Sequence, residues 1–313
     1  MHKDFSNADL LLIVVATIWG VNVAVVKSAL TEFNPLTFNS LRFGISALLS
    51  WGMLGLRGEK MLPRRKDLGS LVVLGLLGHA FYQVLFISGT NLTTAANTAL
   101  LLATIPVWVA ALGAITREEM AGPLTWTGIG MSVLGIALVT ASGDFSLGGS
   151  TLFGDIMLVG GTFFYALYTL KSKALLAKYS PLQFSAWTMT VGAVAMTLVS
   201  CRQISAQDWP GLGFASWGGL AFSAVLAIFL GNYFWNNGIK KLGSARTAVY
   251  NNLSPVTAMI FSSLFLREKI TIMQIAGAVL IILGVSLTRR AKTSSRNREQ
   301  KIKEGFHGQS QLR

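Results

Sequence analysis

Long apolar runs follow one another along almost the whole chain, and they constrain the fold more than any other feature of the sequence. Most are close to twenty residues long, the length that an α-helix needs to cross the hydrocarbon core of a bilayer. Only 12% of the 313 residues are charged, whereas a soluble globular domain carries roughly 25%. The sequence therefore predicts an all-α integral membrane protein.

Ten apolar runs meet the length requirement, and we predict one transmembrane helix for each. The predicted spans are Leu10–Leu30, Leu36–Leu56, Leu68–Gly89, Thr94–Ile115, Leu124–Ser142, Leu152–Leu170, Leu182–Ser200, Leu212–Trp235, Ser244–Leu266 and Ile272–Thr288. The predicted organisation is an N-terminal tail at 1–9, a first five-helix half at 10–142, an external linker at 143–151, a second half at 152–288 and a basic C-terminal tail at 289–313.

The positions of Lys and Arg orient the predicted helices. If the N-terminus is cytoplasmic, basic residues gather on the cytoplasmic side, with a cluster at residues 57–66 and eight more in the C-terminal tail. This is the positive-inside pattern, and it predicts that both termini are cytoplasmic. The net charge of +13 is therefore explained by topology, and we expect no nucleic-acid partner.

The two halves of the chain repeat each other. The motif Pro-Leu-x-Phe at residues 35–38 recurs at residues 181–184, a spacing of 146, and later matches share a spacing of 149, as between Pro106 and Pro255. A half with five spans leaves the membrane on the opposite side from where it entered. The second half is then inverted, as in many secondary transporters whose substrate site lies between the repeats.

These repeated motifs resemble the EamA repeat of the drug/metabolite transporter superfamily, over roughly residues 9–290. The residues that carry the resemblance are Pro35, Leu36, Phe38, Leu41, Arg42, Phe43, Pro106, Glu119 and Gly128 in the first half, and Pro181, Leu182, Phe184, Pro255, Arg267, Glu268, Lys269, Gln274 and Gly277 in the second. The second half departs from the first at Arg42, where it has Trp187 or Thr188. The resemblance implies ten helices, a bacterial inner membrane, and export or exchange of small metabolites, often amino acids.

Polar and aromatic side chains inside the predicted spans are candidates for a substrate pathway, because such groups are costly in lipid. The candidates are Trp19, Asn22, Arg42, His79, Tyr82, Gln83, Asn97, Tyr165, Tyr168, Asn232, Trp235, Asn236, Tyr250 and Asn251. The repeat places the cluster at 79–97 toward the outside and the cluster at 232–251 toward the cytoplasm, so we expect them to line opposite ends of one pathway. Alternatively, the amides tie helices together, and the aromatic side chains pack or form interfacial belts.

Charged and kinked positions add further expectations. Arg42 either binds a substrate carboxylate bidentately or extends toward the outer headgroups. His79 either takes part in proton coupling or is a packing residue. No Asp or Glu falls deep within a predicted span, and Asp155 is assigned to the outside. Pro106 and Pro255 should bend their helices at matched positions and so shape a cavity.

The sequence argues against several other functions. Cys201 is the only cysteine, so we expect neither an intrachain disulfide nor a metal site, and we expect no cofactor. No zinc-protease, phosphate-loop or nucleophile-elbow motif indicates an enzyme. We therefore predict a secondary transporter that works by alternating access. A membrane channel or a structural membrane protein is the main alternative, and a drug-cation exporter or a membrane enzyme is less favoured.

Overall fold

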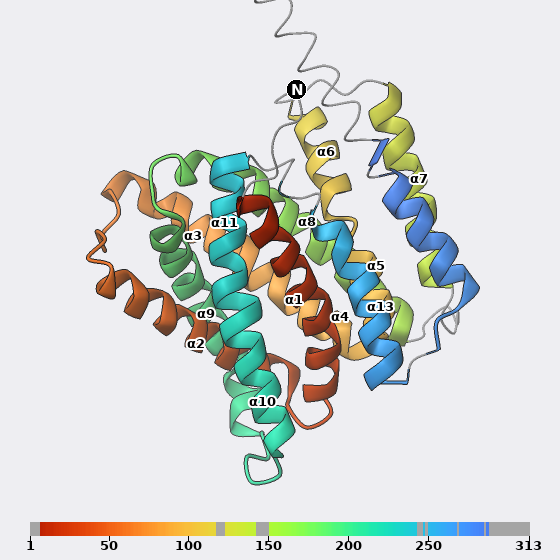
Figure 1. The fold of residues 1–313 in the computed structure, drawn as a ribbon. Helices are drawn as coiled ribbons and strands as arrows, with labels where there is room; N and C mark the ends of the chain where they lie inside the picture. Colours follow the sequence, from red (N-terminus) through yellow and green to blue (C-terminus); the bar gives the residue numbers. More distant parts are fainter. Residues whose placement is uncertain are drawn as a thin grey trace, which may run out of the picture.

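A computed structural model describes residues 7–116, 123–141, 150–242, 247, 250–267, 269–284 and 286–287. All regular secondary structure in these residues is helical (Figure 1). In the first half the elements are α1 (Asn7–Ala29), α2 (Pro35–Leu56), η1 (Arg65–Asp67), α3 (Leu68–Leu76), η2 (Leu77–Phe81), α4 (Tyr82–Leu92), α5 (Ala95–Leu102), α6 (Ile105–Ile115) and α7 (Pro123–Ala141). In the second half they are α8 (Ser150–Leu176), α9 (Pro181–Ser205), α10 (Phe214–Phe222), η3 (Ser223–Leu230), α11 (Gly231–Leu242), η4 (Asn251–Leu253), α13 (Ser254–Phe265) and a helix at Ile272–Gly284.

Within the described part of the chain, six helical segments are long and apolar enough to cross a membrane. They are Asn7–Ala29, Arg65–Leu92, Ala95–Gly113, Ser150–Leu176, Pro181–Ser205 and Phe214–Leu242. Helix α2 coincides with a predicted span but is less apolar, because it carries Asn39 and Arg42. The count of ten crossings stays a prediction. Most of the two predicted tails and of the linker lies outside the described residues, although α1 already begins at Asn7.

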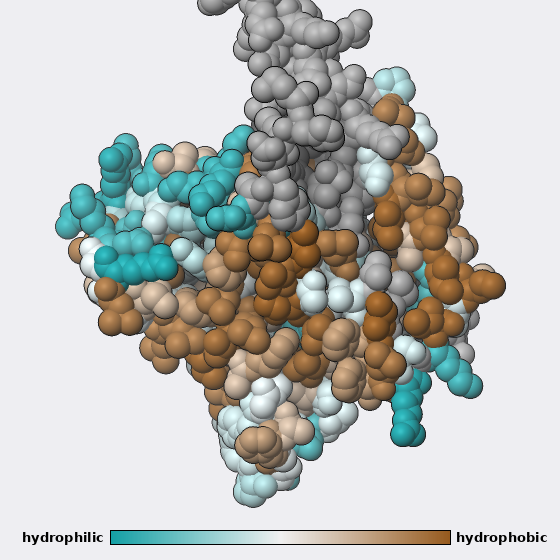
Figure 2. Space-filling view, viewed as in Figure 1, coloured by the Kyte–Doolittle hydropathy of each residue, from teal (hydrophilic) through white to brown (hydrophobic). Residues whose placement is uncertain are grey.

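Large apolar side chains cover the outside of the helix bundle. Leu48 on α2 is 74% exposed, and Leu198 on α9 is 71% exposed. Figure 2 shows apolar side chains spread across the middle of the molecule, with hydrophilic side chains at the upper left, where α2 is joined to α3. Such a surface is stable in lipid, where exposed apolar groups carry no hydration cost.

Helices of the two halves pack against each other. Helix α1 lies along α13, α2 along α9, and α4 along α8. Two glycines allow the last pair to approach closely, since a Cβ on Gly154 would lie only 2.9 Å from the carbonyl oxygen of Gly89. Small residues at a crossing are typical of membrane helix pairs. The start of α8 is thereby held against the end of α4.

Two helices begin next to the matched prolines. Pro106 is the second residue of α6, which follows α5 after a break at Ala103 and Thr104. Pro255 is the second residue of α13, directly after the short helix η4. Proline is well tolerated in the first helical turn, where its missing N–H leaves no bond unmade. The breaks lie where the sequence predicts bends.

Two π-helical segments interrupt other long helices. One is η2, between α3 and α4, and the other is η3, between α10 and α11. The repeat spacing of 149 places residues 77–81 on residues 226–230, which lie inside η3. π-Helical turns are frequently found at functional sites. Both segments contribute residues to the cavity described below.

Candidate functional site

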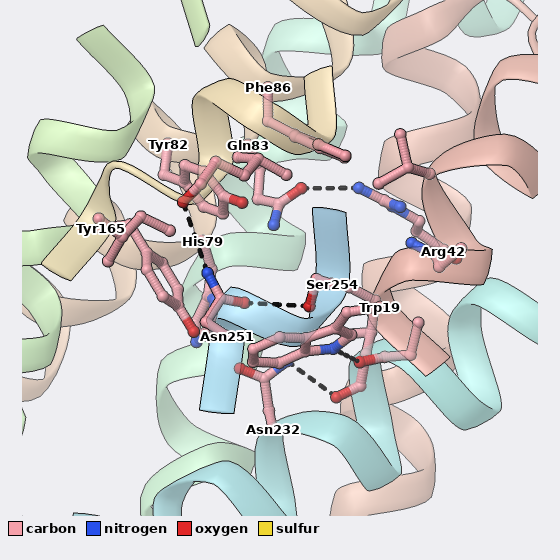
Figure 3. Close-up of a pocket in the computed structure, with 17 residues that line it drawn as sticks. Trp19, Arg42, His79, Tyr82, Gln83, Phe86, Tyr165, Asn232, Asn251 and Ser254 are labelled. Atoms are coloured by element: carbon pink, nitrogen blue, oxygen red, sulfur yellow. Dashed lines mark hydrogen bonds between the residues drawn. The ribbon is translucent and has the colours of Figure 1, made fainter. Parts of the chain in front are cut away.

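A cavity of about 70 Å³ lies between helices of both halves (Figure 3). It has room for several water molecules, since one needs roughly 10–15 Å³. Nine of the predicted pathway residues line it. These nine are Trp19, Asn22, Arg42, His79, Tyr82, Gln83, Tyr165, Asn232 and Asn251. The cavity therefore gathers side chains that the sequence scatters over more than 230 positions.

Arg42 is the only charged side chain among the residues that line this cavity, and it is fully buried. Its Nε donates to Oδ1 of Asn39 at 2.7 Å, its Nη2 to Oε1 of Gln83 at 2.7 Å, and its Nη1 to Oγ of Ser223 at 3.0 Å. In the described part of the chain no carboxylate forms an ion pair with it. Helix packing thus holds a guanidinium against neutral partners, and it is not extended toward headgroups.

A buried cation without a carboxylate partner makes its surroundings electropositive. Its desolvation costs several kcal/mol, which neutral hydrogen-bond acceptors offset only in part. The ring of Phe86, whose centroid lies 5.4 Å from the guanidinium carbon, adds a cation–π contact. An anionic group in the cavity would complete the charge balance.

Aromatic side chains form much of the rest of the wall. The indole Nε1 of Trp19 donates to the carbonyl oxygen of Ala227 in η3 at 2.8 Å (Figure 3). Behind it, the ring of Trp235 packs at 4.9 Å between centroids. On another wall, the rings of Tyr82 and Tyr165 lie 4.7 Å apart. Such walls with a few polar groups suit a small organic ligand.

Two amide oxygens at the cavity are unpaired. Oδ1 of Asn22 and Oδ1 of Asn232 are buried and have no hydrogen-bond partner among the described residues. The side-chain nitrogen of Asn232 donates to the carbonyl oxygen of Ile228 at 2.9 Å. A buried acceptor without a donor is unfavourable, so both oxygens are available to N–H or O–H groups of a ligand.

Some predicted pathway residues do not line the cavity. The ring of Tyr168 packs behind that of Tyr165, at 5.5 Å between centroids. Asn236 donates to Oγ of Ser185 on α9 at 2.9 Å. This bond joins two helices, as the alternative interpretation of the amides predicts.

Two further predicted residues contact buried carboxylates away from the cavity. Nδ2 of Asn97 lies 3.5 Å from Oδ2 of Asp155, and Oδ1 of Asn97 accepts from Nε2 of Gln274 at 2.6 Å. The hydroxyl of Tyr250 donates to Oδ1 of Asp9 at 2.5 Å. The contact between Asn97 and Asp155 joins α5 of the first half to α8, the first helix of the second half. The contact between Tyr250 and Asp9 joins the second half to α1, the first helix of the first half.

The burial of the two carboxylates is a feature that the sequence analysis missed. Asp9 is fully buried in α1, and Asp155, which the sequence assigns to the outside, is 1% exposed in α8. Hydropathy places both near span ends, where a charge is normally hydrated. The repeat spacing of 146 relates Asp9 to Asp155. This match is the signal in the sequence that could have singled out the two carboxylates.

Five members of the two polar clusters lie together and not at opposite ends of a pathway. His79, Tyr82 and Gln83 share the cavity with Asn232 and Asn251. The physical reason is depth, since residues 79–83 lie near the middle of the helical segment Arg65–Leu92, and residue 232 lies well inside the segment Phe214–Leu242. Side chains near the middle of a span meet at the centre of the bundle.

Comparison with known proteins places this architecture among transporters. The profile of the EamA-like transporter family matches residues 6–141 and 152–290. The uncharacterized transporter YyaM of Bacillus subtilis is 30% identical over 89% of this chain and 92% of its own length. An uncharacterized transporter of Archaeoglobus fulgidus is 23% identical over 90% of this chain and 99% of its own.

A solved crystal structure shares the fold. Its TM-score is 0.69, at 17% sequence identity, over 93% of this chain and 99% of the other. The likeness extends over both halves.

Proposed function

Because the chain belongs to the EamA-like transporter family, we propose that this multi-pass membrane transporter exports or exchanges small metabolites that carry a carboxylate, such as amino acids. It works in the cell membrane by alternating access, with ten helices in two inverted halves and both termini in the cytoplasm. The observation that carries the proposal is the buried guanidinium of Arg42 at a cavity between the halves.

Arg42 has bonding capacity left for a substrate. A guanidinium has five N–H donors, and three of them are engaged with Asn39, Gln83 and Ser223. The remaining N–H groups can bind a carboxylate, for which the planar guanidinium is well suited. The small volume of the cavity favours a compact solute.

The unpaired amide oxygens favour an amino acid over a simple acid. An α-ammonium group needs hydrogen-bond acceptors, and Oδ1 of Asn22 and Oδ1 of Asn232 provide them. The ammonium meets no carboxylate among the described cavity residues. A solute that brings its own negative charge is therefore favoured over a free amine.

The ends of the bundle support the inverted arrangement. Nζ of Lys27, near the end of α1, donates to the carbonyl oxygens of Thr90 and Asn91, a few residues before Asn97. Asp9 lies eighteen residues before Lys27 in the same helix, which is about 27 Å at 1.5 Å per residue. The contacts of Asp9 and of Asn97 are thus separated by nearly the thickness of a hydrocarbon core. Contacts at opposite ends are what two inverted repeats require.

Counterflow in proteoliposomes tests the function. Vesicles preloaded with an unlabelled amino acid should accumulate the labelled form transiently, with a rate that saturates, because a carrier exchanges solute through one site. Each amino acid should be paired with the amine that lacks its carboxylate, for example leucine with 3-methylbutylamine. We expect counterflow of one or more amino acids and none of the matched amines.

Other outcomes identify the alternatives. Flux that neither saturates nor shows counterflow would indicate a channel. Equal counterflow of acid and matched amine would show that the guanidinium does not select the substrate. Protein-free vesicles provide the background.

A further inference from the structure

Asp155 forms a separate polar centre outside the central cavity. Its side chain is 1% exposed, and its Oδ1 has no hydrogen-bond partner among the described residues. Its other oxygen lies 3.5 Å from the amide nitrogen of Asn97, which Gln274 holds through a bond of 2.6 Å. Both of these neighbouring side chains are neutral. The backbones of α4 and α8 cross closely at Gly89 and leave little room for these two helices to shift against each other.

No cation in the described part of the chain forms an ion pair with Asp155. The sequences of α5, α6, α7 and the helix at 272–284 contain no ionisable side chain. Helix α4 carries Tyr82, which lies at its opposite end against Tyr165. The neighbouring Lys27 donates to backbone carbonyl oxygens at the end of α4.

An ionised carboxylate is unfavourable in this environment. Removing it from water costs several kcal/mol unless a cation is paired with it, and amides supply only a partial dipole. Binding a proton removes the charge and gives the group an O–H donor. The chemistry of the surroundings thus fits a proton as the ligand of this carboxylate.

A second cavity adjoins this carboxyl group. Asp155 lines a second cavity, of about 480 Å³, together with Trp108, Phe163 and Phe164. The indole Nε1 of Trp108 is buried without a partner as well. The unpaired Oδ1 of Asp155 and this indole Nε1 are thus two polar groups on residues whose cavity is otherwise apolar.

We propose that Asp155 is a proton-binding site that couples protonation to closure of one end of the pathway. When this end is closed, α5 and α8 are in contact through Asn97, and Asp155 is neutral. Helix α5 also lines the central cavity through Ala99 and Leu102, so an opening here would separate Asn97 from Asp155. Water then reaches the carboxylate and allows it to release its proton. This coupling rests on the proposed alternating access.

Infrared difference spectroscopy tests the site without any substrate. A pH titration of the reconstituted protein should show the carbonyl band of a protonated carboxyl group in an apolar environment. Asp155→Asn should lose that band, whereas Asp208→Asn, at an exposed loop position between α9 and α10, should keep it. A band that is unchanged in Asp155→Asn would overturn the proposal.

A second variant covers the case in which Asp155→Asn does not fold. Asn97→Ala removes the amide that contacts Asp155, and it should shift the carbonyl band to higher frequency, because a carbonyl with fewer hydrogen bonds vibrates faster. A wild-type protein without such a band, or a band that does not move in Asn97→Ala, would also refute the site. Because the measurement needs no transport, its failure is distinct from a failure of the counterflow assay.

Discussion

Arg42→Met should abolish exchange of carboxylate solutes and leave a folded protein in the membrane. A hydrogen bond to a charged group contributes about 1.5–3 kcal/mol, and a bidentate contact has two. At 1.4 kcal/mol for each tenfold change, the rate of counterflow at low solute concentration should fall at least roughly 100-fold. The assay uses the amino acid that the wild-type protein exchanges fastest.

The fold should survive this change. Methionine removes a buried charge, and replacing buried ionic groups by apolar ones is often neutral or even stabilising. This gain offsets the loss of donors to Asn39 and Gln83. The monodisperse fraction in size-exclusion chromatography and the unfolding temperature in detergent measure the outcome.

Matched variants separate charge from geometry. Arg42→Lys keeps the charge but not the planar donor fork, so we expect intermediate exchange. Arg57→Met removes an arginine whose Nη1 donates to the hydroxyl of Tyr233 at an exposed position, and it should exchange normally. Wild-type exchange by Arg42→Met would show that the guanidinium does not bind the substrate.

Trp19→Ala should reduce exchange at least roughly tenfold and also lower the unfolding temperature. Truncating a fully buried tryptophan costs about 3–5 kcal/mol in well-packed cores, and Trp19, which is partly buried, should lose a part of that. The change removes part of the cavity wall and the contact with Trp235. It also leaves the carbonyl oxygen of Ala227 in η3 without its indole donor. Counterflow and thermal unfolding in detergent measure the two effects.

The control for Trp19→Ala is a tryptophan on the outside of the bundle. Trp126 on α7 is 52% exposed, so Trp126→Ala should leave exchange nearly unchanged. Trp19→Phe keeps an aromatic wall and loses the hydrogen bond, which shows how much each contributes. If Trp19→Ala exchanged as well as Trp126→Ala, the cavity wall would not be part of the pathway.

The sequence identifies residues that line the cavity where side-chain type and depth suffice. Arg42, Tyr82 and Asn232 are unusual for lipid-embedded positions, and each lies well inside its span, so polarity alone identifies them. The repeat also identifies the helix breaks next to Pro106 and Pro255. The two prolines match at the repeat spacing, whereas hydropathy does not set them apart from the rest of their spans.

What the sequence leaves out depends on neighbouring helices. Asp155 is buried against Asn97, more than 50 positions away, and Gln274, a further 177 positions along the chain, holds the side chain of Asn97. Hydropathy along one helix does not contain these contacts. The π-helical segments η2 and η3 have no distinct composition. Asn236 has the same side chain as Asn232, yet it joins helices because Ser185 lies within reach.

Accessibility of the central cavity from each side of the membrane tests the account most directly. Ser254 lines the cavity, and Ser254→Cys in a Cys201→Ser background gives the protein a single thiol at that position. A membrane-impermeant thiol reagent should modify it in both right-side-out and inside-out vesicles, and an exchanged amino acid should slow both reactions. Modification from one side only, with no protection by any exchanged solute, would contradict a single cavity that opens to each side in turn.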